Sequence, residues 1–163
     1  MLLVLALLPH VRAADPSPPV TDSADRVTTA VVIPADPAAV RAALADPTAA
    51  CRLSTDVLSA RVVATEGPCA LIAVTTRGLT APLAYTMRRC PSADGYTETL
   101  VQTDDFDQQE SRWQLRAVPG GTEVTLQVRS QPRLPLPQRL INATVGSSAV
   151  QALKNLAHRV TGR

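Results

Sequence analysis

The sequence predicts an α+β domain in which an antiparallel sheet of seven strands packs against one long C-terminal helix. Seven stretches rich in β-branched residues are separated by short turn signals, as expected for an antiparallel sheet. Two short helical segments follow the first of these stretches, and the C-terminal residues carry a single apolar stripe at helical spacing. At 163 residues, the chain is long enough for one domain with its own hydrophobic core.

Composition narrows the possible functions. A hydrophobic content of 45% excludes disorder over the whole chain. The formal net charge is only +2, and charged residues make up 18% of the chain, so no strongly basic surface is expected. Aromatic residues make up 2%, which argues against a platform that stacks on bases. Nucleic acid is therefore not an expected partner.

The N-terminus is predicted to be a targeting segment. Residues 2–8, LLVLALL, form an apolar run that is too short to span a bilayer, and Val11 and Ala13 have the spacing of a signal-peptidase site. No Lys or Arg precedes the run, so a disordered tail and a retained anchor stay open as alternatives. We expect a signal peptide at 1–13, a disordered tether at 14–26 and one domain at 27–163. The protein is then periplasmic or secreted.

The first elements of the domain carry clear local signals. Residues 26–35 are rich in β-branched side chains and are predicted to form a strand. A short helix is expected at 36–47, with Asp36 as its N-cap and Pro37 in its first position. Pro47 limits that helix, and the following TAACRL favours a second short helical turn.

Six further strands and the terminal helix complete the predicted domain. The strands are expected at 56–66, 69–77, 83–90, 96–103, 111–118 and 122–130, with Gly, Pro and Asp clusters between them. In the last segment, residues 137–163, the apolar side chains that recur at helical spacing are Ile141, Val145, Ala149, Leu153, Leu156 and Val160.

The hairpin predicted at 69–90 brings two of the three cysteines together. A four-residue loop from Gly78 to Ala81 pairs Arg77 with Pro82 and places Cys69 opposite Cys90. A disulfide is plausible in an oxidising compartment, whereas a register one residue off would leave two thiols. The remaining cysteine, Cys51, is expected to be a small buried hydrophobe.

A second hairpin, at 111–130, shows which face of the sheet is buried. With the turn centred on Gly120 and Gly121, Trp113 faces Val128, Leu115 faces Leu126, and Ala117 faces Val124. Apolar residues then meet on one face while polar residues take the other. The terminal helix is the only predicted element large enough to cover that apolar face.

Three segments carry a family resemblance. They are VVIPADPAAVRAALAD near the start of the domain, SRWQLRAVPGGTEVTLQV across the second hairpin, and LPLPQRLIN at the entry to the last helix. Over residues 27–163 the sequence resembles the helix-grip fold of the START-related superfamily, which includes polyketide cyclases and the birch-pollen allergens. The resemblance implies a curved sheet that wraps around the long helix and leaves an apolar cavity for a lipid, a sterol or another hydrophobic molecule. Because this chain has few aromatic residues, we expect mainly aliphatic walls.

Strand parity identifies candidate residues for the walls of such a cavity. Tyr85 and Met87 take the inward parity of the 69–90 hairpin, and Arg89 shares it, either lining the cavity or extending from its rim into water. Centring the next turn on Ala93 points Thr97, Thr99 and Val101 inward and pairs Arg88 with Glu98 on the outer face. For Tyr85, Met87 and Trp113, an ordinary position in the core is the alternative interpretation. The complete candidate ligand-binding set is Ile72, Val74, Tyr85, Met87, Arg89, Thr99, Val101, Trp113, Leu115, Ile141 and Val145.

The proline-rich segment 129–138 precedes the last helix and, by the resemblance, lies near one mouth of the cavity. Its leucines, Leu134 and Leu136, are placed to make a transient contact with a membrane or to cover the ligand. Because prolines restrict the backbone, docking of an apolar tip would cost little entropy. The alternative is a rigid connection whose leucines pack inward.

Signals for catalysis are few. We find no Ser/His/Asp set, no cluster of metal ligands and no phosphate-binding loop, so neither a metal nor a cofactor is expected. His158 is expected to be solvated, and the acidic stretch 103–110 lacks the pattern of an EF-hand and is predicted to be a hairpin turn. The sequence favours a carrier of a lipid or similar molecule. A cyclase or aromatase using Tyr85 and Arg89, and an accessory domain with a filled core, remain alternatives.

Overall fold

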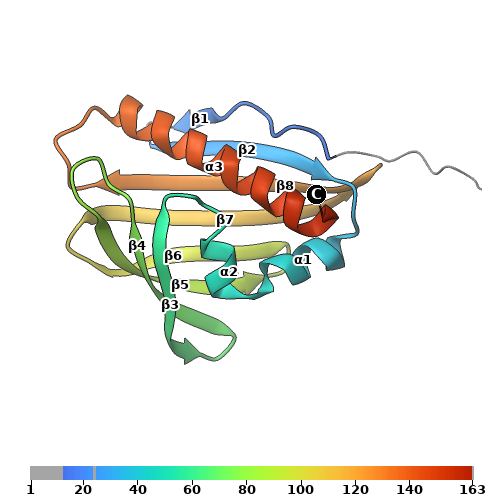
Figure 1. The fold of residues 1–163 in the computed structure, drawn as a ribbon, viewed down its shortest axis with the longest axis horizontal. Helices are drawn as coiled ribbons and strands as arrows, with labels where there is room; N and C mark the ends of the chain where they lie inside the picture. Colours follow the sequence, from blue (N-terminus) through green and yellow to red (C-terminus); the bar gives the residue numbers. More distant parts are fainter. Residues whose placement is uncertain (1–12, 24, 163) are drawn as a thin grey trace, which may run out of the picture.

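In the computed structural model, which describes residues 13–162 except residue 24, an eight-stranded antiparallel sheet packs against one long helix (Figure 1). The strand order is β1-β2-β8-β7-β6-β5-β4-β3. The strands are β1 (Val20–Ser23), β2 (Arg26–Ile33), β3 (Val57–Glu66), β4 (Cys69–Thr76), β5 (Leu83–Ser92), β6 (Gly95–Thr103), β7 (Phe106–Val118) and β8 (Gly121–Pro132). The helices are α1 (Pro37–Ala45), α2 (Pro47–Cys51) and α3 (Gln138–Thr161).

The eighth strand corrects the predicted count of seven. β1 pairs with β2 and lies in the segment predicted to be a disordered tether. Upstream of it, the amide of Ser17 donates to the carbonyl of Ala30 at 2.7 Å. Without β1, the outer edge of β2 would leave backbone groups unpaired. The prolines that led us to expect disorder precede β1 and run along the edge of the sheet, where proline is tolerated. The predicted signal peptide lies, apart from Ala13, outside the described residues.

Both short helices begin at prolines: Pro37 was predicted to start the first helix, whereas Pro47, which was predicted to limit that helix, is itself the first residue of α2. Pro37 is the first residue of α1, which follows Asp36 and buries Val40 and Leu44. The side chain of Asp46 accepts a 2.9 Å hydrogen bond from the amide of Ala49, and this contact caps α2. The two helices lie beside the C-terminal half of α3 (Figure 1).

The register of β4 and β5 is confirmed. Ile72 pairs with Met87 and Val74 with Tyr85, as the sum of opposite residue numbers predicts. The same register brings Cys69 and Cys90 together in a disulfide. Cys51 is free and buried, as expected.

The β7–β8 hairpin keeps its predicted faces but not its predicted partners. Trp113 pairs with Leu126 rather than with Val128, so the register is displaced by two residues. The turn is centred on Pro119 and Gly120, not on the two glycines, because Pro119 has a fixed negative φ and Gly120 adopts a φ of 92°. A displacement of two residues leaves each side chain on the expected face of the sheet.

The register of β5 and β6 corrects the prediction in a way that affects the cavity. Arg89, and not Arg88, pairs with Glu98, because the turn has two central residues and closes between Ser92 and Gly95. A one-residue displacement exchanges the faces of a strand. Tyr96 and Glu98 are therefore buried, whereas Thr99 and Val101 are exposed, with Val101 exposed by 44%.

The core has two parts. In the larger part, the C-terminal half of α3 packs through Leu153 and Leu156 against β2 and β8. The smaller part gathers Ile72, Val74 and Met87 of β4 and β5 with Cys51 at the end of α2. This division leaves room between the N-terminal half of α3 and the middle of the sheet.

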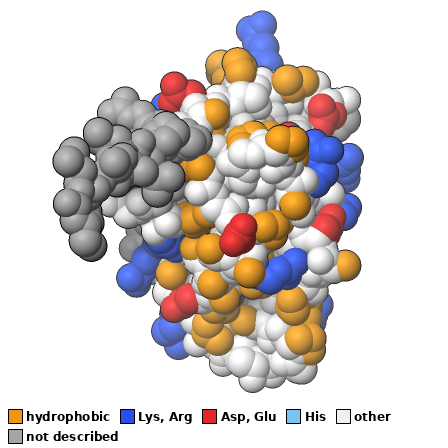
Figure 2. Space-filling model, turned by 90° about the vertical axis from the view of Figure 1, so that its right-hand side faces the viewer, with side chains coloured by type: hydrophobic (Ala, Val, Ile, Leu, Met, Phe, Trp, Pro, Cys, Tyr) orange, Lys and Arg blue, Asp and Glu red, His pale blue; other side chains and the backbone are white. Residues whose placement is uncertain are grey.

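The exterior carries charges of both signs. On the face that lies at the right of Figure 1, hydrophobic, basic and acidic side chains are interspersed, and none of the three kinds covers a large continuous area (Figure 2). No helix in the described part of the chain is long and apolar enough to cross a membrane.

Candidate functional site: a cavity between the helix and the sheet

A cavity of about 550 Å³ lies between α3 and the sheet. Its volume is in the range of roughly 300–1,000 Å³ that is typical of sites for small molecules. Residues from both parts of the core line it, including Met87 from the smaller part and Trp113 from the larger one. The cavity therefore lies where the two parts of the core do not meet.

Six of the predicted site residues line this cavity. The sheet contributes Val74, Tyr85, Met87 and Trp113, and the helix contributes Ile141 and Val145. The ring of Tyr85 packs edge-on against Phe106, with ring centroids 5.2 Å apart. Burial raises the pKa of Tyr85, so its hydroxyl stays protonated at neutral pH and is available as a donor.

Four other predicted residues lie elsewhere. Ile72 is fully buried in the smaller part of the core, and Leu115 packs against the larger part. Thr99 and Val101 are on the outer face of the sheet, so the prediction that they line the cavity was wrong. The error comes from the one-residue displacement in the β5–β6 hairpin.

Arg89 points inward but is neither a rim residue nor part of the wall. It is 2% exposed and forms an ion pair with the carboxylate of Glu98. Its Nη2 donates to the carbonyl of Leu44 at 2.8 Å, and its guanidinium lies 4.3 Å from the centre of the Tyr96 ring. These contacts fasten β5 and β6 to α1 and satisfy most of a charge that would be costly to bury alone.

A line of polar groups on the floor of the cavity was missed by the sequence analysis. Glu98 lines the cavity and accepts hydrogen bonds from Arg89 and from the hydroxyl of Ser111. Gln109, Ser111 and Trp113 alternate along β7 and all line the cavity. The parity of Trp113 was enough to place Gln109 and Ser111 inward, whereas Glu98 required the correct β5–β6 register.

Two buried polar atoms in this wall lack partners. Oε1 of Gln109 and Nε1 of Trp113 have no hydrogen bond among the described residues. Buried polar groups are nearly always paired, and an unpaired one costs about 1–3 kcal/mol. These atoms are therefore candidates for contact with a bound molecule.

Cys51 lines the cavity with a thiol whose pKa is raised by burial. Burial raises the pKa of its thiol to about 12, and the nearby carboxylate of Glu98 acts in the same direction. The thiolate, which is the reactive form, is therefore scarce at neutral pH. Its place in the wall is that of a small apolar side chain.

Hydrogen bonds hold α3 over the cavity. The hydroxyls of Ser54 and Ser148 lie 2.9 Å apart and connect the segment after α2 with the middle of the helix. About two turns further on, the side-chain amide of Asn155 donates to the carbonyl of Leu53 at 2.7 Å. The C-terminal half of α3 is thus anchored, while its N-terminal half covers the cavity.

Loops surround the opening of the cavity. Leu134 and Leu136 are half-buried and line the cavity, in agreement with the inward-packing alternative. The more exposed leucines here are Leu79 and Leu140, at 71% and 52%. Contact of Leu134 and Leu136 with a membrane stays a prediction.

The acidic stretch is partly turn and partly strand. Residues 104 and 105 connect β6 to β7, which begins at Phe106. Asp107 forms an ion pair with Arg133 of the neighbouring β8–α3 loop. Among residues 13–23 and 25–162, no group of three or more acidic, His or Cys side chains could hold a metal ion.

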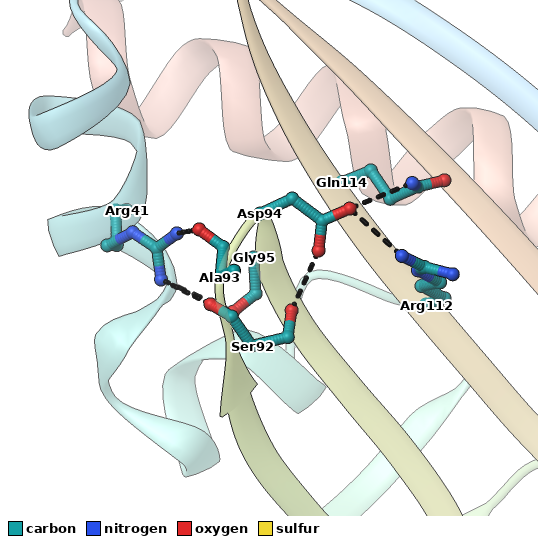
Figure 3. Close-up of polar contacts among 7 residues, drawn as sticks. All are labelled: Arg41, Ser92, Ala93, Asp94, Gly95, Arg112 and Gln114. Atoms are coloured by element: carbon teal, nitrogen blue, oxygen red, sulfur yellow. Dashed lines mark hydrogen bonds and ion pairs between the residues drawn. The ribbon is translucent and has the colours of Figure 1, made fainter.

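A polar cluster fastens the β5–β6 turn to its neighbours (Figure 3). Asp94 in the turn accepts hydrogen bonds from Gln114, Ser92 and Arg112, which lower its pKa to about 2, with Gln114 making the largest contribution. Arg41 of α1 donates to the carbonyl of Ala93 at 3.0 Å. The cluster fixes the position of α1 against the sheet.

Comparisons with known proteins give the same fold. A family model described as "Polyketide cyclase / dehydrase and lipid transport" matches residues 24–161. A START superfamily protein from Mycobacterium smegmatis is 17% identical, with a TM-score of 0.73 and coverage of 85% of this chain and 98% of the other. A search of curated protein sequences gave no match.

Two further structures are similar over most of their length. The Zhui aromatase/cyclase from Streptomyces sp. R1128 is 13% identical, with a TM-score of 0.73 and coverage of 85% of this chain and 94% of the other. A STAR-related lipid transfer protein from Xanthomonas axonopodis is 18% identical, with a TM-score of 0.63 and coverage of 87% and 89%. At these identities, the likeness shows a shared fold.

Proposed function

Because the chain belongs to the polyketide cyclase/dehydrase and lipid transport family, we propose that it binds or transfers a lipid or another hydrophobic small molecule in the cavity under α3. The observation that carries this proposal is the cavity itself, about 550 Å³ with mostly aliphatic walls. Burial of apolar ligand surface there would drive binding by about 25 cal/mol per Å², before the costs of ordering.

The proposal includes a periplasmic or secreted location. It is supported by the apolar N-terminal run of the sequence and by the Cys69–Cys90 disulfide, which would persist in an oxidising compartment. A carrier in such a compartment would move its cargo between membranes or between a membrane and a partner protein.

A cyclase-type enzyme is the second candidate, and the carboxylate of Glu98 in the cavity wall is the observation in its favour. Both oxygens of that carboxylate already accept hydrogen bonds, one from Arg89 and one from Ser111, so it would have to leave a partner to act on a substrate. An accessory domain with a filled core is less compatible with a cavity of this size.

Native mass spectrometry of protein purified from a periplasmic extract without detergent tests the proposal. We expect a stoichiometric hydrophobic adduct, a mass that corresponds to cleavage after Ala13, and a deficit of two protons for one disulfide. A bare mass from folded protein that also takes up no fluorescent lipid would contradict the carrier function. Turnover of a co-purified molecule would favour the enzyme.

A further inference from the structure

We propose that the ligand in this cavity carries an uncharged hydroxyl or carbonyl group rather than a carboxylate or a phosphate. This inference rests on the proposed function and specifies the chemistry of the ligand. It follows from the charges of the lining residues and from the polar atoms in the floor of the cavity that have no partner.

The charges that line the cavity do not suit an anion. Among the described residues, the lining contains two carboxylates, Asp56 and Glu98, and one guanidinium, that of Arg77. Arg77 is exposed and follows the end of β4 at the opening, so it would be hydrated rather than directed into the apolar interior. An anionic group deep in the cavity would therefore meet more negative than positive charge.

Arg89 is the cation nearest the floor, but it is not among the residues that line the cavity, and of its three guanidinium nitrogens only Nε has no hydrogen bond. Its two terminal nitrogens bond to Glu98 and to the carbonyl of Leu44, and its plane faces the Tyr96 ring. Glu98, which lines the cavity, is the group that pairs with Arg89, so a ligand anion could take the place of this ion pair only by displacing the carboxylate of Glu98, which would then be buried without a partner. A neutral ligand leaves the ion pair intact.

The unpaired atoms fit an uncharged oxygen. Oε1 of Gln109 can accept a hydrogen bond from a hydroxyl, and Nε1 of Trp113 can donate one to a hydroxyl or a carbonyl. The two residues are four positions apart on β7, about 13 Å along the strand, so they act as separate contacts. A purely hydrocarbon ligand would leave both atoms unpaired.

The test compares ligands that share one chain length and differ in the polar group. Nile red, a neutral fluorescent probe, is bound to the full chain and then displaced by dodecanol, dodecan-2-one or dodecanoate at about pH 8, where the carboxyl group is ionised. We expect dodecanol or dodecan-2-one to bind at least about tenfold more tightly than dodecanoate.

The outcomes separate this inference from the function on which it rests. If dodecanoate binds as tightly as the neutral compounds or more tightly, the inference is overturned while the carrier function stands. If folded protein binds neither Nile red nor any of the three compounds, both are overturned.

Variants of the cavity floor test the assignment of the polar contacts. Gln109→Leu preserves side-chain size and should weaken binding of dodecanol about fivefold, without changing the affinity for Nile red. Gln108→Leu, on the outer face of the same strand, is the matched control and should change neither value. Trp113→Phe removes the indole N–H donor and makes the ring smaller, and it should weaken the binding of dodecan-2-one. Unchanged affinities in both folded floor variants would remove these atoms from the site.

Discussion

At the scale of single residues, the least predictable feature is the ion pair between Arg89 and Glu98. The sequence placed Arg89 inward correctly, but it assigned Glu98 to the outer face. Side-chain exposures of 2% and 10% make the pair part of the interior. Each charge offsets the cost of burying the other, because either one alone would be buried without a counter-ion.

The first prediction follows from that dependence. Glu98→Gln should lower the free energy of unfolding by about 3–5 kcal/mol, because it leaves the guanidinium of Arg89 unpaired. Urea denaturation monitored by circular dichroism measures the change. The matched control is Glu66→Gln, which breaks the exposed pair with Arg88 and should cost about 0–1 kcal/mol. Equal effects of the two substitutions would contradict a buried, compensated pair.

A second prediction concerns the acid stability given by Asp94. Its pKa is lowered in the folded protein from 3.8 to about 2, so the folded state favours the ionised form more than the unfolded state does. The stabilisation is present above the unfolded pKa and is lost as the pH falls through the folded pKa. Asp94→Asn should therefore be less stable than wild type at about pH 5, and the difference should shrink towards pH 2. The measurement is a series of urea denaturations across this range. A difference that is constant with pH would show that the charge of Asp94 is not involved.

At the scale of elements, the three hairpins show why some registers could be predicted and others could not. For β4 and β5, the loop ends proposed from Gly78 and Ala81 agreed with the spacing of two cysteines, so two signals supported one register. The β5–β6 turn offered only a Pro-Ser-Ala-Asp-Gly run, which did not distinguish an odd from an even number of turn residues. In the β7–β8 hairpin, Pro119 and Gly120 favour a tight turn, and the register is therefore displaced by two residues from the predicted one. This displacement leaves each side chain on the predicted face of the sheet.

The Cys69–Cys90 disulfide gives a third prediction. It joins the paired strands β4 and β5 across a sequence separation of 21 residues. Replacing both cysteines by serine should lower stability by about 3 kcal/mol, mainly because the unfolded chain gains freedom. Urea denaturation with and without a reductant measures this effect. The reductant should lower the free energy of unfolding of the wild-type protein and leave that of the double variant unchanged. A reductant effect that persists in the double variant would assign the stabilisation to another cause.

At the scale of the whole molecule, the general architecture followed from pattern and composition. The periodicity of apolar residues predicted the order of strands and helices along the chain, the buried face of the sheet and the helix that covers it. The edge strand β1 was not, because its pairing depends on backbone groups of β2 rather than on its own side chains. The volume of the cavity could not be predicted from the sequence either, because it depends on how closely α3 approaches the sheet.

The central claim is that the space beside Met87 holds the ligand, and filling that space tests it most directly. Met87 is 7% exposed and lines the cavity. Met87→Trp should occupy part of the cavity and abolish the binding of Nile red, while circular dichroism shows that the fold persists. Val101→Trp, on the outer face, adds a similar ring without entering the cavity and should bind the probe as wild type does. The decisive measurement is a Nile red titration of the folded Met87→Trp variant: loss of binding is the result we predict, and wild-type affinity would place the ligand elsewhere.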